Sequence, residues 1–331
     1  MNRQAAESAA GDAAIARIVT RLSSEYVLRA FQLLTDAFGD IRAGLLIHAI
    51  NSANVAPLLR SNGGRYAAGP GGVFPDEMRR PISIARLAET ARLPFESTRR
   101  IVQRLIDAGY CVRVNGGVIV PRAIAERPSA VRSLIANAGY VRRFVRGLQA
   151  AGLDAAGRPA GSVRPEYAGD DATLARIVSD LSAGYILRSL QLLADTYGDV
   201  RAGIVAQTII IANIAHLDTQ TGEGQRYAGI DTTPPDAVRR PIRIARLGES
   251  LGLPYETTRA HVRRLVNAGV CVRLDGGVIV PGAILERPSA ARLMLANVGY
   301  VRRFMADLHA VGFDATRGVP GSARTRQAGA A

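Results

Sequence analysis

The 331-residue sequence contains no lysine and only two cysteines, and each scarcity limits what the chain can be. All 42 basic residues are therefore arginines, an imbalance that a GC-rich coding bias explains without a physical cause. Cys111 and Cys271 belong to no C-x-x-C pair, which excludes a redox dithiol of that type. We expect each cysteine to fill a buried strand as a small apolar residue.

Long apolar runs are absent as well. The longest, from Gly203 to Leu217, is too short to span a bilayer and is interrupted by Gln207 and Asn213. The N-terminal residues lack the apolar stretch of a secretory signal. These features predict a cytoplasmic protein with no membrane partner.

The sequence also lacks the clusters that catalysis or metal binding would need. Its four histidines are unevenly placed and have no metal-ligand spacing: His48, His216, His261 and His309. No glycine-rich fingerprint for nucleotides follows a predicted strand. We therefore predict that the protein is not an enzyme and holds neither a metal nor a cofactor.

What the sequence does contain is a long internal duplication. Residues 79–144 and 239–304 align without a gap at an offset of 160, and about two thirds of the positions are identical. A repeat of this length is the unit of the fold. It predicts two domains and a Gly/Pro-rich linker, with disordered tails: 13–151 and 172–312 as the domains, 152–171 as the linker, and 1–12 and 316–331 as the tails.

Each repeat contains the same predicted elements in the same order. In the first repeat these are a short strand, two helices and a hairpin, at 81–84, 85–93, 94–109 and 110–121. The hairpin turns at Asn115-Gly116-Gly117, and its counterpart turns at Asp275-Gly276-Gly277. Two helices precede this block and a long one follows it. We call residues 81–121 the first head and residues 241–281 the second head.

This order of elements resembles the winged helix-turn-helix superfamily of bacterial transcription regulators. The resemblance is carried by IARLAETARLPFESTRRIVQRLIDAGYCVRVNGGVIV and by IARLGESLGLPYETTRAHVRRLVNAGVCVRLDGGVIV. The flanking helices are similar to the MarR-type plan, in which such helices form a dimer interface. The resemblance implies a mainly α fold with small β wings, built from two repeats about a pseudo-twofold axis. Helices at 128–150 and 288–310 would form the inter-repeat interface and set the heads about 34 Å apart. The chain departs from the pattern by carrying both heads itself.

In such proteins the second helix of the head enters the major groove, and the wing contacts the DNA backbone. Here these recognition helices would be residues 94–109 and 254–269. Removing the expected buried stripe leaves a set of outward candidates for DNA binding. In the first head they are Ser97, Arg99, Arg100, Gln103 and Arg104, with Arg113, Asn115 and Gly116 on the wing. In the second head they are Thr257, Arg259, His261, Arg263 and Arg264, with Arg273 and Gly276 on the wing. Arginine can bind guanine through two hydrogen bonds, and glutamine can bind adenine likewise.

The formal net charge of +14 favours a polyanionic partner, and we predict double-stranded DNA. The two repeats differ at several outward positions of the recognition helix, such as Arg100 and Ala260. The chain is therefore expected to be a sequence-specific transcriptional regulator, a single-chain pseudo-dimer that reads unlike half-sites and is associated with the nucleoid.

Several alternatives stay open at this stage. A plasmid-type replication initiator, another nucleoid-associated DNA binder, or a winged-helix protein-interaction module would share much of the pattern. Polar residues repeated beside apolar helices, such as Asp40 and Asn54, would either cap helices and hold loops or line a pocket for a small-molecule effector. The pair Arg79 and Arg80 would either clamp DNA phosphates or form an exposed charge pair. A further homodimer contact or an RNA polymerase contact is also left open.

Overall fold

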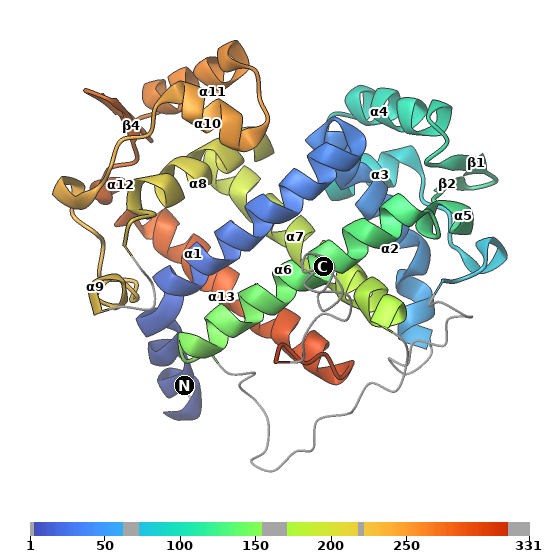
Figure 1. The fold of residues 1–331 in the computed structure, drawn as a ribbon, viewed down its shortest axis with the longest axis horizontal. Helices are drawn as coiled ribbons and strands as arrows, with labels where there is room; N and C mark the ends of the chain where they lie inside the picture. Colours follow the sequence, from blue (N-terminus) through green and yellow to red (C-terminus); the bar gives the residue numbers. More distant parts are fainter. Residues whose placement is uncertain (1–2, 62–72, 154–170, 218–221, 317–331) are drawn as a thin grey trace, which may run out of the picture. The chain divides into compact units, whose positions relative to one another are not determined.

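The structure is a computed structural model that describes residues 3–61, 73–153, 171–217 and 222–316. It is mainly helical and contains two small antiparallel hairpins (Figure 1). Almost all of the predicted linker, 152–171, and of the predicted C-terminal tail, 316–331, lies outside the described residues.

The first repeat contains two long helices, a head and a third long helix. The elements are α1 (Arg3–Phe38), α2 (Ile41–Ser61), the 3-10 helix η2 (Asp76–Met78), α3 (Ile84–Ala91), α4 (Phe95–Asp107), β1 (Val112–Val114), β2 (Gly117–Ile119), α5 (Arg122–Ala125) and α6 (Pro128–Ala150).

The second repeat follows the same order, with one extra short helix. Its elements are α7 (Asp171–Tyr197), α8 (Val200–Ile214), α9 (Gly222–Gln225), η3 (Asp236–Val238), α10 (Ile244–Leu251), α11 (Tyr255–Asn267), β3 (Val272–Leu274), β4 (Gly277–Ile279), α12 (Gly282–Leu285) and α13 (Pro288–Ala310).

Two local predictions were wrong. The expected strand at 81–84 is reduced to a single bridge between Ile82 and Val118, since the following residues already begin α3. Residues 3–12, expected to be disordered, form the first turns of α1. Alanine-rich sequence favours helix, and Asp12 in this segment forms an ion pair with Arg302.

The chain forms two compact units, and each unit takes segments from both repeats. Unit 1 comprises 1–36, 147–156 and 185–303; unit 2 comprises 37–146, 157–184 and 304–331. The predicted domains, 13–151 and 172–312, follow the duplication, whereas the compact units do not. The difference arises because the first helix of each repeat packs against helices of the other repeat.

Buried polar contacts within each unit show this exchange. In unit 1, Asn297 of α13 donates from Nδ2 to Ser23 Oγ of α1 at 2.8 Å. In unit 2, the equivalent Asn137 of α6 donates to Ser182 Oγ of α7 at 2.9 Å. Because a buried amide is costly without a partner, these bonds favour pairing between unlike repeats.

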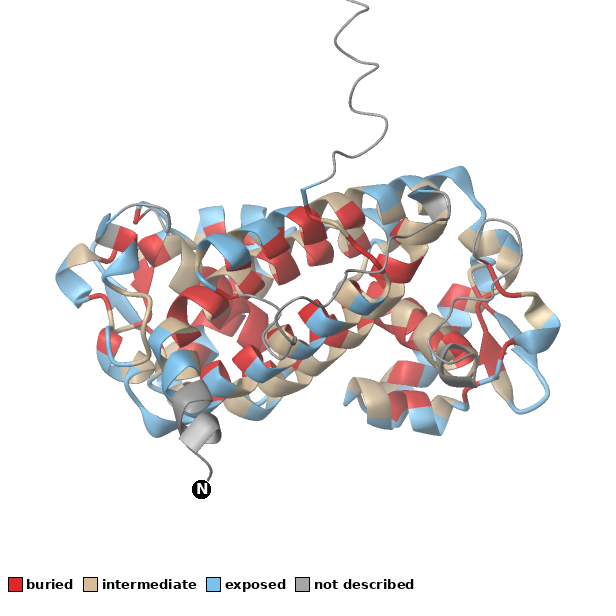
Figure 2. Ribbon diagram, turned by 90° about the horizontal axis from the view of Figure 1, so that it is seen from below, coloured by how far each residue is buried: buried red, intermediate tan, exposed pale blue. Residues whose placement is uncertain are grey.

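Burial follows the helical periodicity of the sequence. In Figure 2 the buried residues form stripes along one side of the long helices, as amphipathic helices require. Helix α8 is mostly buried and packs Val205 and Ile209 against Val262 and Leu265 of α11 in the second head. Cys111 and Cys271 are buried, as the sequence predicted, but they lie immediately before β1 and β3 and not within a strand. Burial raises the pKa of both thiols to about 12, so they stay protonated.

Candidate nucleic-acid interface

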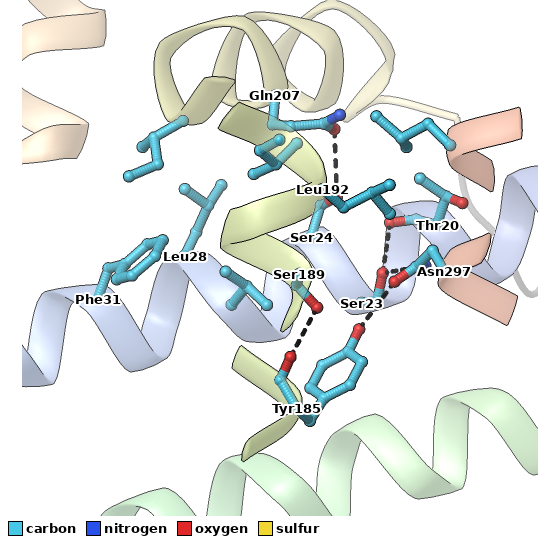
Figure 3. A pocket seen from close by; sticks show the side chains of 14 residues that line it. Thr20, Ser23, Ser24, Leu28, Phe31, Tyr185, Ser189, Leu192, Gln207 and Asn297 are labelled. Carbon is cyan, nitrogen blue, oxygen red and sulfur yellow. Dashed lines mark hydrogen bonds between the residues drawn. The ribbon is translucent and has the colours of Figure 1, made fainter. Parts of the chain in front are cut away.

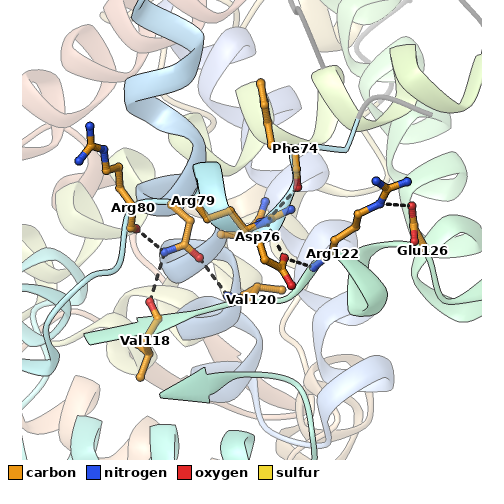
Figure 4. A network of polar contacts seen from close by, with 10 residues as sticks. Phe74, Asp76, Arg79, Arg80, Val118, Val120, Arg122 and Glu126 are labelled. Atoms are coloured by element: carbon orange, nitrogen blue, oxygen red, sulfur yellow. Dashed lines mark hydrogen bonds and ion pairs between the residues drawn. The ribbon is translucent and has the colours of Figure 1, made fainter. Parts of the chain in front are cut away.

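One buried asparagine joins each wing to the helix beneath it. Asn54 of α2 donates from Nδ2 to the carbonyls of Arg80 (2.7 Å) and Val118 (3.2 Å) and accepts from Val120 N–H at 3.0 Å. Asn213 of α8 makes the same three hydrogen bonds in the second repeat, with the corresponding residues Arg240, Val278 and Val280. Figure 4 shows the first of these networks. The amide holds a loop and a strand in place, which confirms the structural alternative for this residue over an effector pocket.

The first arginine of each Arg-Arg pair belongs to this scaffold. Arg79 is 5% exposed and donates from Nη1 to Asn51 Oδ1 at 3.1 Å, while its Nε lies 3.4 Å from Asp76 Oδ1 (Figure 4). Arg239, also 5% exposed, lies 3.2 Å from Asp236 Oδ1. Burial lowers the pKa of both guanidinium groups. Neither side chain can therefore reach a DNA phosphate, whereas the next arginine in each pair is exposed.

The carboxylates that hold these arginines also orient the chain after the wing. Asp76 Oδ1 accepts the backbone N–H of Arg122 at 2.6 Å, and Asp236 Oδ1 accepts that of Gly282 at 2.7 Å. Each bond lies at the N-terminal end of a short helix, α5 or α12, where a carboxylate is favourable.

Each wing is a tight hairpin with a two-residue turn. Val114 faces Gly117 across the first turn, and Leu274 faces Gly277 across the second. A Cβ on Gly117 would lie 2.2 Å from the carbonyl oxygen of Ile82, so only glycine fits at a backbone φ of +148°. The predicted wing residues Arg113, Asn115, Gly116, Arg273 and Gly276 are all exposed.

The helices predicted at 94–109 and 254–269 are present as α4 and α11, with slightly shorter bounds. Both begin after a proline. Helix α4 ends at Asp107 and is followed by Ala108 and by Gly109 at a φ of +71°, where Tyr110 N–H donates to Leu105 O at 2.8 Å. The sequence predicts a buried stripe of Thr98, Ile101, Val102, Leu105 and Ile106; the first four are buried and Ile106 is half-buried.

Most predicted contact residues lie on the opposite, exposed side of these helices. They are Arg99, Arg100, Gln103 and Arg104 on α4, and Arg259, Arg263 and Arg264 on α11. Ser97 and Thr257 are half-buried near the N-terminal ends.

One predicted contact residue was wrong. His261 is only 9% exposed and lies on the buried stripe of α11, at the position that Ile101 occupies in α4. Burial lowers its pKa, and its Nδ1 has no hydrogen-bond partner. A helical residue faces the core or the solvent according to its position, and a change from isoleucine to histidine does not alter that position.

The exposed side chains of the two helices differ in their partners. Arg99 Nε lies 3.0 Å from Glu96 Oε2, and Arg104 Nη2 lies 3.5 Å from Asp40 Oδ2. Gln103 donates to Asp107 Oδ1 at 2.9 Å. In contrast, the side chains of Arg263 and Arg264 form no hydrogen bond or ion pair with any residue in the described part of the chain. The second helix thus presents two uncommitted guanidinium groups.

Helices α4 and α11 and the wings carry exposed apolar side chains that the sequence did not predict. Phe95 and Tyr255, the first residues of α4 and α11, are 49% and 51% exposed. On the wings, Val112, Val114, Val272 and Leu274 of β1 and β3 are exposed too. Each of these strands pairs on one side only and lies at the edge of its hairpin.

Neither a scan against protein-family models nor searches of curated proteins and of solved structures found a match to this chain. Within the described residues no group of histidine, cysteine and acidic side chains could hold a metal ion. None of the described helices has both the length and the apolar character needed to cross a membrane. The site must therefore be interpreted from its own geometry: two copies of an arginine-bearing helix beside a glycine-tipped hairpin.

Proposed function

We propose that the protein is a sequence-specific, double-stranded DNA-binding transcriptional regulator with two winged helix-turn-helix heads. In this proposal α4 and α11 enter the major groove, and the two wings contact the backbone. The observation that carries the proposal is the duplicated set of exposed arginines on α4 and α11, above a buried scaffold that is the same in both heads.

Charge and geometry support this assignment together. The formal net charge is +14, and a guanidinium that is exposed on a rigid helix can bind guanine O6 and N7 at once. The glycine at each wing tip leaves the backbone N–H groups open to a phosphate. The heads would act as a single-chain pseudo-dimer about a twofold axis, with unlike half-sites because the exposed residues differ.

The test is a gel shift with duplex DNA across a salt series. Six or more phosphate contacts would lower the affinity by about three to five orders of magnitude between 50 and 200 mM salt. Selection from a random duplex library should return a site with two unlike halves. A perfectly symmetric site would contradict the unlike half-sites.

Two matched pairs of variants distinguish the effect of an arginine's position from the effect of its charge. Arg104→Ala with Arg264→Ala should abolish specific binding without unfolding the chain. Arg132→Ala with Arg292→Ala removes the same charge from exposed positions of α6 and α13 and should leave the selected sequence unchanged. An unchanged footprint for the first pair would refute the assignment.

A protein-interaction module is the second candidate, because Phe95 and Tyr255 are exposed at the start of the proposed recognition helices. Aromatic side chains of this kind are enriched at protein interfaces. The same salt series separates the two candidates, since a protein-interaction module should bind duplex DNA weakly at every salt concentration.

A further inference from the structure

Aromatic side chains in the described part of the chain are buried or half-buried, with two exceptions. Figure 3 shows the usual situation in unit 1, where the Tyr185 ring lies in the interior and its hydroxyl donates to Asn297 Oδ1 at 3.2 Å. The exceptions are Phe95 and Tyr255, which are 49% and 51% exposed. They occupy the same position in the two repeats, so their exposure belongs to the shared fold of the heads.

The backbone beneath each exposed ring is held in the same way in both heads. Thr98 is fully buried, and its backbone N–H and its hydroxyl both donate to the Pro94 carbonyl, at 3.0 and 3.2 Å. Thr258 makes the same two bonds to Pro254, at 3.0 and 3.1 Å. Because proline also restricts the backbone before each ring, the rings project from a rigid first turn. A ring that is already positioned loses little entropy when it meets a partner.

Neither ring pairs with another aromatic side chain or with a cation among the described residues. In contrast, the half-buried rings of Phe38 and Tyr110 lie edge to face, with their centroids 5.0 Å apart. The exposed part of Phe95 and of Tyr255 is therefore available to a molecule outside the chain.

The surface around each exposed ring is charged. One helical turn further along lie the exposed Arg99 and Arg259, each paired with a glutamate of its own helix, at 3.0 and 3.4 Å. The other exposed residues of α4 are all charged or polar, and so are those of α11 except Ala260. The core of a protein–protein interface is apolar, which this surface does not provide. It suits the major groove of DNA, which presents one apolar group, the 5-methyl of thymine, among polar base edges.

The two rings are retained although exposed neighbours on the same helices have diverged. The change from Phe95 to Tyr255 adds one hydroxyl and keeps the ring, whereas Arg100 is replaced by Ala260. Exposed residues that differ between the heads suit bases that differ between the half-sites. A ring that is present in both heads suits a feature that both half-sites share.

We propose that Phe95 and Tyr255 each contact the 5-methyl group of a thymine, at corresponding positions in the two half-sites. The N-terminal residues of a recognition helix approach the base edges, and a helical side chain leans towards the N-terminus of its helix. The ring covers the methyl group, and both apolar surfaces leave water. The inference rests on the proposed function and adds that the unlike half-sites have one base in common.

The test replaces single thymines of the selected duplex by deoxyuridine, which pairs with adenine in the same way and lacks only the methyl group. Fluorescence-anisotropy titrations measure the dissociation constant for each replacement. One replacement in each half-site should weaken binding by the wild type about fourfold, the effect of exposing one buried methyl group. The two thymines should lie at corresponding positions of the half-sites.

Two variants assign each ring to its own thymine. In Phe95→Ala, deoxyuridine in one half-site should have no further effect, while deoxyuridine in the other should still weaken binding about fourfold. Tyr255→Ala should show the reverse. Tyr255→Phe is the conservative control and should keep both effects, because the ring is retained. Urea denaturation verifies that each variant is folded, and substitutions at exposed positions should change stability little.

Three results would overturn the contact while keeping the proposed function. A deoxyuridine effect of equal size in the wild type and in Phe95→Ala would show that another residue contacts the methyl group. The absence of an effect at every thymine would show that no residue does. Unchanged duplex binding by Phe95→Ala would leave the ring to a protein partner. A wild type that binds no duplex would instead refute the proposed function itself.

Discussion

The two heads have the same buried polar scaffold and different exposed surfaces. Asn54 and Asn213 make the same three hydrogen bonds, and Asp76 and Asp236 accept equivalent backbone N–H groups. Each buried bond has a fixed geometry, and losing one leaves a donor or acceptor without a partner. These asparagine and aspartate contacts are the same in both heads, whereas the exposed residues of α4 and α11 differ.

Helices α4 and α11 differ on both their buried and their exposed sides. On the buried side, Ile101 is replaced by His261, whose Nδ1 has no partner. On the exposed side, Arg104 is engaged by Asp40, whereas Arg264 forms no ion pair with a described residue. We therefore expect the core of the second head to be packed less well than that of the first, and its exposed arginine Arg264 to be less restrained by ion pairs.

The largest expected effect tests whether the two scaffolds are equivalent. Asn54→Ala and Asn213→Ala each remove three buried hydrogen bonds and leave the backbone groups of the wing without partners. Each variant should lower the free energy of unfolding of its unit by about 3 kcal/mol. Urea denaturation measures this loss.

The exposed wing-tip variant Asn115→Ala is the control and should change stability by less than about 0.5 kcal/mol. A loss below about 1 kcal/mol in either scaffold variant, or a large difference between the two, would show that the scaffolds are not equivalent.

A smaller effect tests a difference between His48 and its counterpart Gln207. Burial lowers the pKa of His48 to about 4, against 6.5 for a free histidine. The unfolded chain therefore binds a proton before the folded chain does, and stability falls as the pH decreases from about 6.5 towards 4. His48→Gln should remove this loss, which amounts to about 2 kcal/mol at pH 5.

The measurement compares urea denaturation of the wild type and His48→Gln at pH 8 and pH 5. Only their difference isolates His48, because burial raises the pKa of Asp180 to about 7 and gives unit 2 an opposite dependence. That carboxyl takes up a proton in the folded state first, so its contribution to stability grows as the pH falls from 7 towards 4. Parallel pH profiles for the two proteins would contradict the prediction.

The smallest effect tests the ion pair on the first head. Asp40→Asn keeps the hydrogen bond to Arg42 N–H, since asparagine also caps helices, but removes the ion pairs of Asp40 with the side chains of Arg104 and Arg42. An exposed pair is worth up to about 1 kcal/mol, so affinity for the selected duplex should rise by up to about fivefold.

Asp199→Asn is the matched control on the second head, where Arg264 forms no ion pair with a described residue. Both variants remove one negative charge, so the difference between their affinities measures the release of the two guanidinium groups that Asp40 holds, those of Arg104 and Arg42. Equal gains in fluorescence-anisotropy titrations would show that the pair does not restrain Arg104.

Much of each head could be predicted from local sequence. Proline and glycine mark the ends of α4 at Pro94 and Gly109, and Asn115-Gly116 specifies the turn of the wing. The exposed arginines follow from helical periodicity alone. The same periodicity places His261 on the buried stripe, at the position that Ile101 occupies in α4, and the prediction that it is exposed followed its polar side chain instead.

Other features could not be predicted because they depend on contacts between distant segments. Arg79 and Arg80 are identical in type and adjacent, yet only Arg79 meets Asp76 and Asn51 in the interior. Residues 3–12 were expected to be disordered from composition, but Asp12 has a partner 290 positions away. The residues next to them in the sequence do not indicate these distant partners.

The sequence by itself determined the duplication, the order of helices and hairpins, and the exposed arginines, since these depend on short-range spacing and turn chemistry. Tertiary structure alone decided which segments form each compact unit and which arginine of each pair is buried. The physical reason is that the burial of a side chain depends on which distant segments pack against it. Here the first helix of each repeat meets the helices of the other.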